Sequence, residues 1–123
     1  MEPKPNWIVV FYEDEIGNKP VKEYLTSITN EKEKATLLNV ITMLQKFGPD
    51  IQSTKMDKII DGSIRELRKG RHRILYGRHG NIFVLLTAFL KRTDKTPPGE
   101  IKLANERFTR YSKSLNNNIR NPR

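Results

Sequence analysis

The feature that most constrains the fold is a series of β-strand patterns near the middle of the chain. Three segments with the pattern of β-strands cover residues 64–68, 71–78 and 82–90. Short turns that contain glycine separate these segments, and this alternation is typical of consecutive hairpins. The sequence therefore predicts an antiparallel meander as the centre of the fold.

A strand and a short helix are predicted before the meander. Residues 7–12 are largely β-branched and aromatic, which favours a strand. Between Val21 and Ile28, apolar residues recur at the i, i+3, i+4 and i+7 positions that form one face of a helix. Asn18 is the predicted N-cap of this helix, and Pro20 lies in its first turn.

A longer amphipathic helix is predicted next. Asn30 and Glu33 have the spacing of a capping box, and Gly48-Pro49 ends the apolar stripe that follows. This stripe consists of Leu37, Leu38, Ile41, Leu44 and Phe47. Residues 50–63 show no clear period and are predicted to be mostly loop.

The last predicted element is a helix after Thr96-Pro97-Pro98, with an apolar face that consists of Ile101, Ala104, Phe108 and Tyr111. The order of elements predicts an α+β fold with two N-terminal helices packed on one face of a small antiparallel sheet and a C-terminal helix. The other face of the sheet, or its rim, is expected to be open for a ligand. We expect one domain over residues 1–123, with flexible ends at 1–6 and 115–123.

Composition excludes several classes of protein. The chain has no cysteine, which excludes a disulfide scaffold, a thiolate zinc site and a cysteine nucleophile. With two histidines, His72 and His79, neither a metal site nor another cofactor is predicted. The longest apolar run, residues 82–90, is too short to cross a bilayer, and the first residues lack the pattern of a secretory signal. We therefore expect a soluble, cytoplasmic protein without a membrane partner.

Positive charge is concentrated in the meander. The net charge of the chain is +9, and residues 65–95 carry nine basic against two acidic side chains, a net charge of +7. Concentrated positive potential favours a polyanionic partner such as nucleic acid. The alternative interpretation is a basic protein with no ligand.

The first hairpin of the meander sorts these charges onto one face. With residues 69–70 at its turn, Arg68 lies across from Arg71 and Glu66 lies across from Arg73. Three arginines repel one another, and a single carboxylate cannot neutralise them all, so an anion is predicted between them. The alternative is a surface ion pair that uses Glu66 and explains one or two of the arginines.

Further basic and aromatic candidates flank this face. Lys91 and Arg92 directly follow the most apolar strand, where they would suit either phosphate binding or the protection of an aggregation-prone strand. Lys95 lies in the loop before the last helix. Arg65 and Tyr76 fall on the apolar face, although an edge position would let the Tyr76 ring stack on a base.

These residue types suit RNA cleavage by attack of a 2′-hydroxyl on the adjacent phosphate. Because the nucleophile belongs to the substrate, the protein has to orient the RNA backbone, stabilise negative charge and transfer two protons. Arginine suits the second task, since its planar fork binds two phosphate oxygens. Glu66 is the candidate base, and His72, Tyr76 and Lys91 are the candidate acids, although a histidine on the apolar face is more often packed than catalytic.

Five short motifs lie within residues 64–107. They are Glu66-Leu67-Arg68, Arg73-Ile74-Leu75-Tyr76, Phe89-Leu90-Lys91-Arg92-Thr93, Lys95-Thr96-Pro97 and the pair Ala104 and Arg107. Together they resemble the RelE/HigB superfamily of bacterial toxins, in particular its phage-derived HigB-like branch, over residues 7–112. The resemblance implies a RelE-like toxin that enters the ribosomal A site and cleaves messenger RNA. It also implies an antitoxin partner with a helix-turn-helix domain.

The resemblance assigns site residues by position. Arg73 matches a strand arginine that contacts the scissile phosphate, and Lys91 and Arg92 match a basic pair after the last strand. Glu66 stands where the RelE branch has a catalytic lysine, and the late tyrosine of that branch aligns near Pro98, so neither of these roles transfers. The predicted catalytic residues are Arg73, Lys91, Arg92, Arg68 and Glu66, and the predicted RNA-binding residues are Arg65, Lys69, Arg71, Tyr76 and Lys95.

Two other functions stay open at this point. A toxin of the related ParE type would share the fold but would inhibit DNA gyrase by binding to it. A noncatalytic module of phage origin that binds nucleic acid or a protein partner would need only the positive charge.

Overall fold

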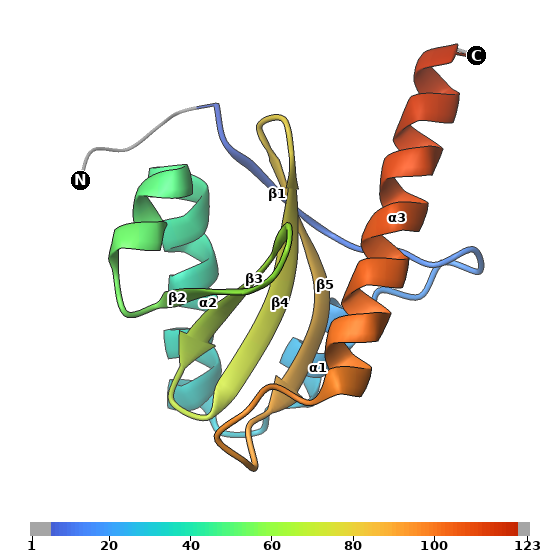
Figure 1. Cartoon of the computed structure of the whole chain (residues 1–123). Helices are drawn as coiled ribbons and strands as arrows, with labels where there is room; N and C mark the ends of the chain where they lie inside the picture. Colours follow the sequence, from blue (N-terminus) through green and yellow to red (C-terminus); the bar gives the residue numbers. More distant parts are fainter. Residues whose placement is uncertain (1–5, 121–123) are drawn as a thin grey trace.

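A five-stranded sheet forms the centre of the computed structural model, which describes residues 6–120 (Figure 1). The elements in chain order are β1 (Ile8–Phe11), α1 (Pro20–Ser27), α2 (Glu31–Phe47), the 3-10 helix η1 (Gly48–Ser53), β2 (Asp57–Asp61), β3 (Ile64–Lys69), β4 (His72–His79), β5 (Ile82–Leu90) and α3 (Pro98–Arg120). The strand order is β1-β5-β4-β3-β2, and every neighbouring pair is antiparallel except β1 and β5, which are parallel. The predicted α+β fold is therefore confirmed.

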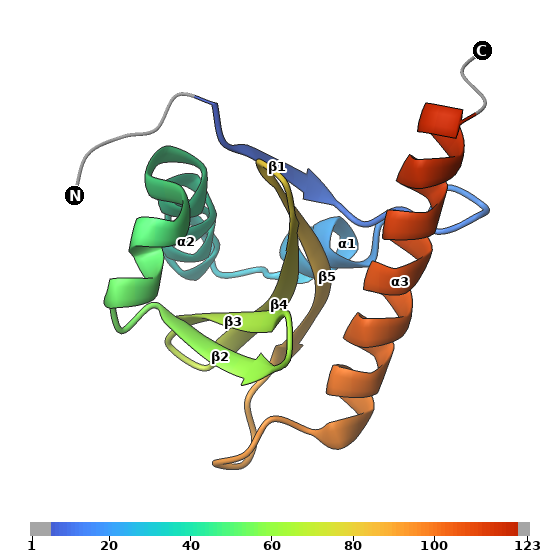
Figure 2. The ribbon, with the colours of Figure 1, turned by 45° about the horizontal axis from the view of Figure 1, so that its top comes forward.

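Helices cover both faces of the sheet (Figure 2). One core cluster joins the sheet to α1 and α2, and among its buried side chains are Val21, Leu37, Leu44, Ile74 and Phe83. A second cluster joins the opposite face to α3, and it includes Ile64, Leu75, Val84, Leu86 and Ala104. Helix α3 thus covers the face that we expected to be open, which leaves the rim of the sheet as the expected place for a ligand.

The start of α1 differs from the prediction. Its N-cap is Lys19 rather than Asn18, and Lys19 provides no side-chain capping bond. The backbone N–H of Asn18 instead donates to the Asp14 carboxylate at 2.8 Å, and the N–H of Ile16 donates to the same oxygen at 3.0 Å. These bonds, with the one from Asn18 foremost, lower the pKa of Asp14 below its ordinary value. Asn18 is therefore part of the turn before the helix.

The predicted start of α2 is confirmed, but its capping box is only half formed. The Asn30 side chain accepts a hydrogen bond from the N–H of Glu33 at 2.9 Å. The Glu33 carboxylate does not return to Asn30 and pairs with His72. The buried face of α2 also includes Val40, whereas Leu38 of the predicted stripe is exposed.

The segment predicted to be mostly loop, residues 50–63, contains most of η1 and the edge strand β2. Strand β2 pairs with β3, and its residue at the first paired position, Asp57, is a buried carboxylate. A strand whose inward side chain is charged lacks the alternation of apolar and polar residues that would predict it. This missing alternation explains why the sequence pattern missed β2.

The register of the first hairpin differs from the predicted one by two residues. Arg68 pairs with Arg73 and Glu66 pairs with Leu75, so the turn consists of Gly70 and Arg71. Gly70 has a φ of 58°, and a glycine at the first position of a two-residue hairpin turn is a favoured arrangement. Because side chains alternate with a period of two, this shift leaves the strand residues on their predicted faces, but it moves Arg71, which was predicted to lie across from Arg68, into the turn.

Helix α3 packs closely on the sheet and continues to Arg120, beyond the apolar pattern that predicted it. A Cβ atom added at Gly77 of β4 would lie 2.8 Å from the Phe108 ring, so glycine is needed for this approach. The flexibility predicted for residues 1–6 and 115–123 stays a prediction. Residues 1–5 and 121–123 lie outside the described part of the chain, and residues 115–120 form the end of α3.

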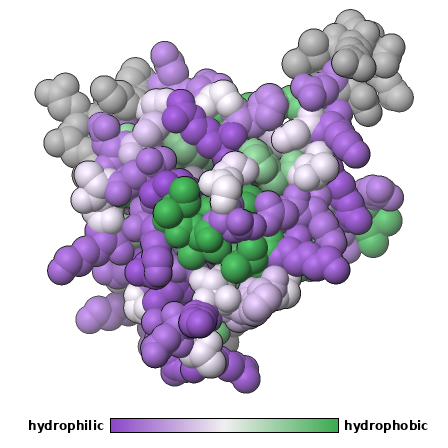
Figure 3. Space-filling model, viewed as in Figure 1, coloured by the Kyte–Doolittle hydropathy of each residue, from purple (hydrophilic) through white to green (hydrophobic). Residues whose placement is uncertain are grey.

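The face of the molecule seen in Figure 3 is mainly hydrophilic, with a hydrophobic patch near its centre. Among the described helices, none combines the length and apolar character needed to cross a membrane.

Candidate active site

A small basic pocket lies at the rim of the sheet, where β3 ends, β4 begins and β5 leads into the loop before α3. It is lined by Glu66, Arg68, Arg73, Phe89, Lys91, Thr93, Asp94, Lys95 and Thr96. Arg73 faces Arg68 across one strand pair and Phe89 across the other, which places three pocket residues in one row of the sheet. The hairpin and the segment after β5 thus bring four predicted cations, Arg68, Arg73, Lys91 and Lys95, around one pocket.

Glu66 lies at the centre of this pocket and is only 1% exposed. Its Oε1 accepts a hydrogen bond from Arg68 Nε at 2.9 Å and lies 3.6 Å from Arg73 Nε. Its Oε2 accepts a hydrogen bond from the Thr96 hydroxyl at 2.7 Å. A buried carboxylate needs such partners, and Glu66 in return joins two strands to the loop before α3.

Arg73 is held in one orientation by its neighbours. Its side chain is nearly buried, and its Nη1 donates to the carbonyl oxygens of Gly70 at 2.8 Å and His72 at 2.9 Å. Burial lowers the pKa of Arg73, the negative charge of Glu66 raises it, and the positive charge of Arg68 lowers it. An arginine with these neighbours still carries its charge at neutral pH. Arg73 is therefore a fixed, charged donor at the rim.

The basic pocket has a cavity volume of about 10 Å³, roughly the space of one water molecule. Glu66 pairs with Arg68 and Arg73, two of the three hairpin arginines. This ion pairing agrees with the alternative that the sequence left open. An incoming phosphate would have to compete with Glu66 for Arg68 and Arg73.

Three other predicted basic residues lie beside the pocket. Arg71 is in the hairpin turn, where its Nε and Nη2 donate to the carbonyl oxygen of Lys91 at 3.3 Å and 3.1 Å. Lys69 is exposed on the opposite face of β3, and Arg92 is exposed beside Lys91. Neither Lys69, Arg71 nor Arg92 lines the basic pocket.

Arg65 and Tyr76, which were predicted to bind RNA, lie on the α2 side of the sheet. The Tyr76 hydroxyl donates to Asp57 Oδ2 at 2.5 Å, and Arg65 Nε donates to Asp57 Oδ1 at 2.7 Å. Tyr76 is 1% exposed, so its ring has no face on which a base could stack. Burial, followed by the bond to Asp57, raises the pKa of Tyr76 well above its ordinary value. These residues form an internal network away from the pocket.

We expect Tyr76→Phe to destabilise the fold and to leave the predicted RNA cleavage unchanged. The substitution removes one hydrogen bond from the buried Asp57 carboxylate, which costs about 1–3 kcal/mol. Urea denaturation of the two proteins measures this loss. A Tyr76→Phe protein of unchanged stability would contradict the structural role. A folded variant that no longer cleaves RNA would show that Tyr76 takes part in the reaction.

His72 is packed, as the sequence predicted, but the sequence did not identify its partners. Its Nδ1 lies 2.6 Å from the Tyr24 hydroxyl, and its Nε2 pairs with the Glu33 carboxylate. Burial and the Glu33 charge raise the pKa of Tyr24. These contacts link α1, α2 and β4 across 48 and 39 residues of sequence, so no local pattern could reveal them.

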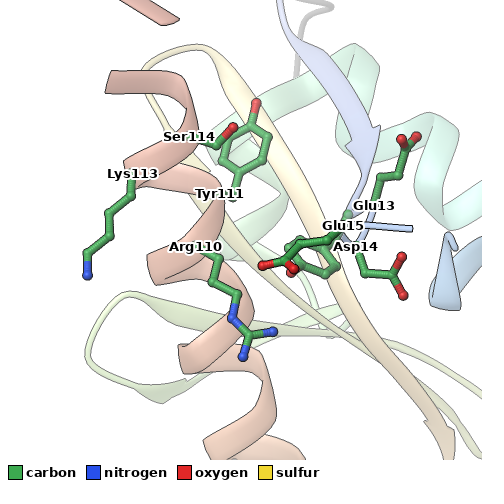
Figure 4. Close-up of a pocket in the computed structure, with 8 residues that line it drawn as sticks. Glu13, Asp14, Glu15, Arg110, Tyr111, Lys113 and Ser114 are labelled. Atoms are coloured by element: carbon green, nitrogen blue, oxygen red, sulfur yellow. The ribbon is translucent and has the colours of Figure 1, made fainter. Parts of the chain in front are cut away.

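A larger cavity, of about 690 Å³, lies between α3 and the segment before α1 (Figure 4), and it shares no lining residue with the basic pocket. Residues Glu13–Glu15 before α1 line one side of it, and Arg110, Tyr111 and Lys113 of α3 line the other. Its acidic side does not suit a polyanion. None of the candidate residues contributes to this cavity, so we do not assign the nucleic-acid site to it.

The fold and the basic pocket define a class of small α+β proteins, consistent with the RelE-like fold, whose sheet presents clustered cations at its rim. A family model described as "Phage derived protein Gp49-like (DUF891)" matches residues 24–109, which include every residue that lines the pocket. The chain belongs to this family, which is part of the RelE/HigB-like superfamily of toxins in toxin–antitoxin systems. A search of curated proteins found no match to the chain.

Proposed function

We propose that the chain is the toxin of a type II toxin–antitoxin system and acts as a ribosome-dependent mRNA endonuclease in the cytoplasm. The observation that carries this proposal is the convergence of Arg68, Arg73, Lys91 and Lys95 on one pocket. Family membership supports the toxin assignment. We place the chain in the HigB-like branch because Glu66 stands where the RelE branch has a lysine.

The proposed reaction begins when a phosphate of the RNA backbone takes the place of Glu66 beside Arg68 and Arg73. The released Glu66 carboxylate accepts the proton of the neighbouring 2′-hydroxyl, whose oxygen forms a bond to phosphorus. The bond from phosphorus to the 5′-oxygen breaks, and Lys91 donates a proton to this leaving group. The products are a 2′,3′-cyclic phosphate and a 5′-hydroxyl end.

Arginine suits the charge that develops in this reaction. Arg73 is already oriented by the Gly70 and His72 carbonyl oxygens, so it loses little freedom when it binds the phosphate. Arg68, on the paired strand, is more exposed and can follow the phosphate as negative charge accumulates. Lys95 and Arg92 extend the positive surface along the RNA.

Inducible expression in bacteria tests the proposal. Growth and translation are expected to stop, and the messages recovered from arrested cells should be cut within codons and carry 5′-hydroxyl ends. Co-expression of a helix-turn-helix protein from the adjacent gene should restore growth, as expected for a cognate antitoxin.

Different outcomes separate the competing functions. Intact messages together with a DNA-damage response would contradict nuclease activity and indicate a gyrase inhibitor. Harmless expression combined with salt-sensitive RNA binding would instead indicate a noncatalytic module.

A further inference from the structure

A second cavity opens at the same end of the sheet, on the face toward α2. It has a volume of about 270 Å³, and its side chains come from Glu33, Thr36, Lys69, Arg71, His72 and Leu90. Pockets for drug-sized ligands start at about 300 Å³, so this cavity has room for one planar ring system. The basic pocket, at about 10 Å³, has no such room.

The two cavities are lined by neighbouring residues at the rim of the sheet. Neighbouring residues of a strand point to opposite faces and have Cα atoms about 3.8 Å apart. Arg68 and Lys91 therefore face the basic pocket, while their neighbours Lys69 and Leu90 face the second cavity. A single RNA strand that passed over the rim would bring the nucleotide next to a phosphate in the basic pocket to this cavity.

The second cavity offers an apolar surface beside positive charge. Leu90 ends the most apolar strand of the chain, yet it is 40% exposed. Lys69 and Arg71 lie at the hairpin turn beside it, and Arg71 is held there by its bonds to the Lys91 carbonyl oxygen. A nucleotide needs this combination, an apolar contact for the base and cations for its phosphate.

Glu33 gives the cavity a fixed hydrogen-bond acceptor. Its side chain is 47% exposed, so the carboxylate is accessible to a ligand. Its backbone N–H is bound by the Asn30 side chain, and its Oε1 is held by His72. His72 is in turn held by the Tyr24 hydroxyl. The orientation of this acceptor is therefore set before a ligand arrives.

We propose that this second cavity is a nucleobase subsite that prefers bases with an exocyclic amino group. Adenine, cytosine and guanine present such donors to a carboxylate. The single donor of uracil, its N3–H, lies between two carbonyl oxygens that the negative charge of Glu33 repels. The subsite rests on the proposed function, because it requires the RNA backbone to bind in the basic pocket.

Titration of the ¹⁵N-labelled full chain with short RNAs tests the subsite by NMR. The probes are 2′-O-methyl trinucleotides of adenine or uracil, in which the blocked hydroxyl prevents cleavage. We expect the adenine probe to bind about 5- to 10-fold more tightly, the gain from about one ordinary hydrogen bond, because Glu33 is half-exposed. It should shift the amide signals of Lys69, Arg71 and Leu90 as well as that of Arg73, whereas the uracil probe should shift mainly that of Arg73.

Two variants and one control assign the effect to the cavity. Glu33→Gln keeps the size of the side chain and should reduce the preference for adenine to about equal affinity, because a neutral amide also donates to uracil. Leu90→Ser should weaken adenine binding without a change in charge. Glu31→Gln alters another exposed carboxylate in the first turn of the same helix, outside the cavity, and should keep the preference.

The outcomes distinguish the subsite from the nuclease proposal. Equal affinity for both probes, with shifts confined to the surroundings of Arg73, would overturn the subsite and leave the nuclease proposal intact. A preference that survives both Glu33→Gln and Leu90→Ser would also overturn the subsite. If neither probe binds at low salt, the subsite is wrong, whereas the nuclease proposal is tested separately by message cleavage on translating ribosomes.

Discussion

Arg73→Ala is expected to reduce mRNA cleavage about 100- to 1000-fold, the usual cost of removing one donor that stabilises transition-state charge. Arg73 lines the basic pocket, and two backbone carbonyl oxygens, those of Gly70 and His72, fix the direction of its charged side chain. Cleavage measured on translating ribosomes, together with growth after induction, should show this loss. Arg73→Lys keeps the charge but loses the planar fork, and it should recover only part of the activity.

The control must separate lost chemistry from lost stability. Removing Arg73 leaves the buried Glu66 with fewer partners, which costs about 1–3 kcal/mol. The double variant Arg73→Ala with Glu66→Gln neutralises that carboxylate and should regain stability without regaining activity. Lys102→Ala removes one exposed cation from α3, outside the pocket, and should keep full activity. A folded Arg73→Ala protein that still arrests growth would refute the assigned role.

Gly48→Ala is expected to destabilise the protein by about 2–4 kcal/mol, combining left-handed strain with overpacking. Gly48 ends α2 with a φ of 54°, and an added Cβ atom would lie 2.4 Å from the Trp7 ring. The Trp7 ring packs against Phe83 and Arg78, so it cannot move without disturbing the β1 end of the core. Urea denaturation followed by fluorescence measures the effect, because Trp7 is the single tryptophan of the chain.

Gly62→Ala is the matched control for Gly48→Ala. Gly62 has a similar φ of 52°, but an added Cβ atom would have no neighbour within 4 Å. This substitution should therefore cost about 1–2 kcal/mol from backbone strain alone. Equal losses for the two variants would show that the contact with Trp7 has no energetic role.

Much of the fold could be predicted because several elements carry strong local patterns. Strands β3 to β5 alternate with glycine turns, and Asn30 marks the start of α2 through its side chain. Strand β2 was missed because its inward residue is Asp57, whose partners Arg65 and Tyr76 come from other strands. The hairpin register was wrong because Gly70 takes the first position of the turn, which no apolar pattern determines.

The sequence could predict which candidate site residues share one face of the sheet, because side chains alternate along a strand. Arg68, Arg73 and Glu66 share one face in either register, since the error was two residues. The sequence could not reveal that Thr96 donates to Glu66, because the loop before α3 has no regular geometry. It could not reveal the Glu33–His72 pair either, because α2 meets β4 only in the folded protein.

The parallel pairing of β1 with β5 affects how the protein folds during synthesis. Ile8 at the start of β1 pairs with Ile82 in β5, so the first strand made has no partner until the last strand leaves the exit tunnel. Lys91 and Thr96 follow β5 within a few residues. The sheet and the basic pocket are thus completed together, late in translation. A nascent chain still attached to its own ribosome is harmless for most of its synthesis under the proposed function.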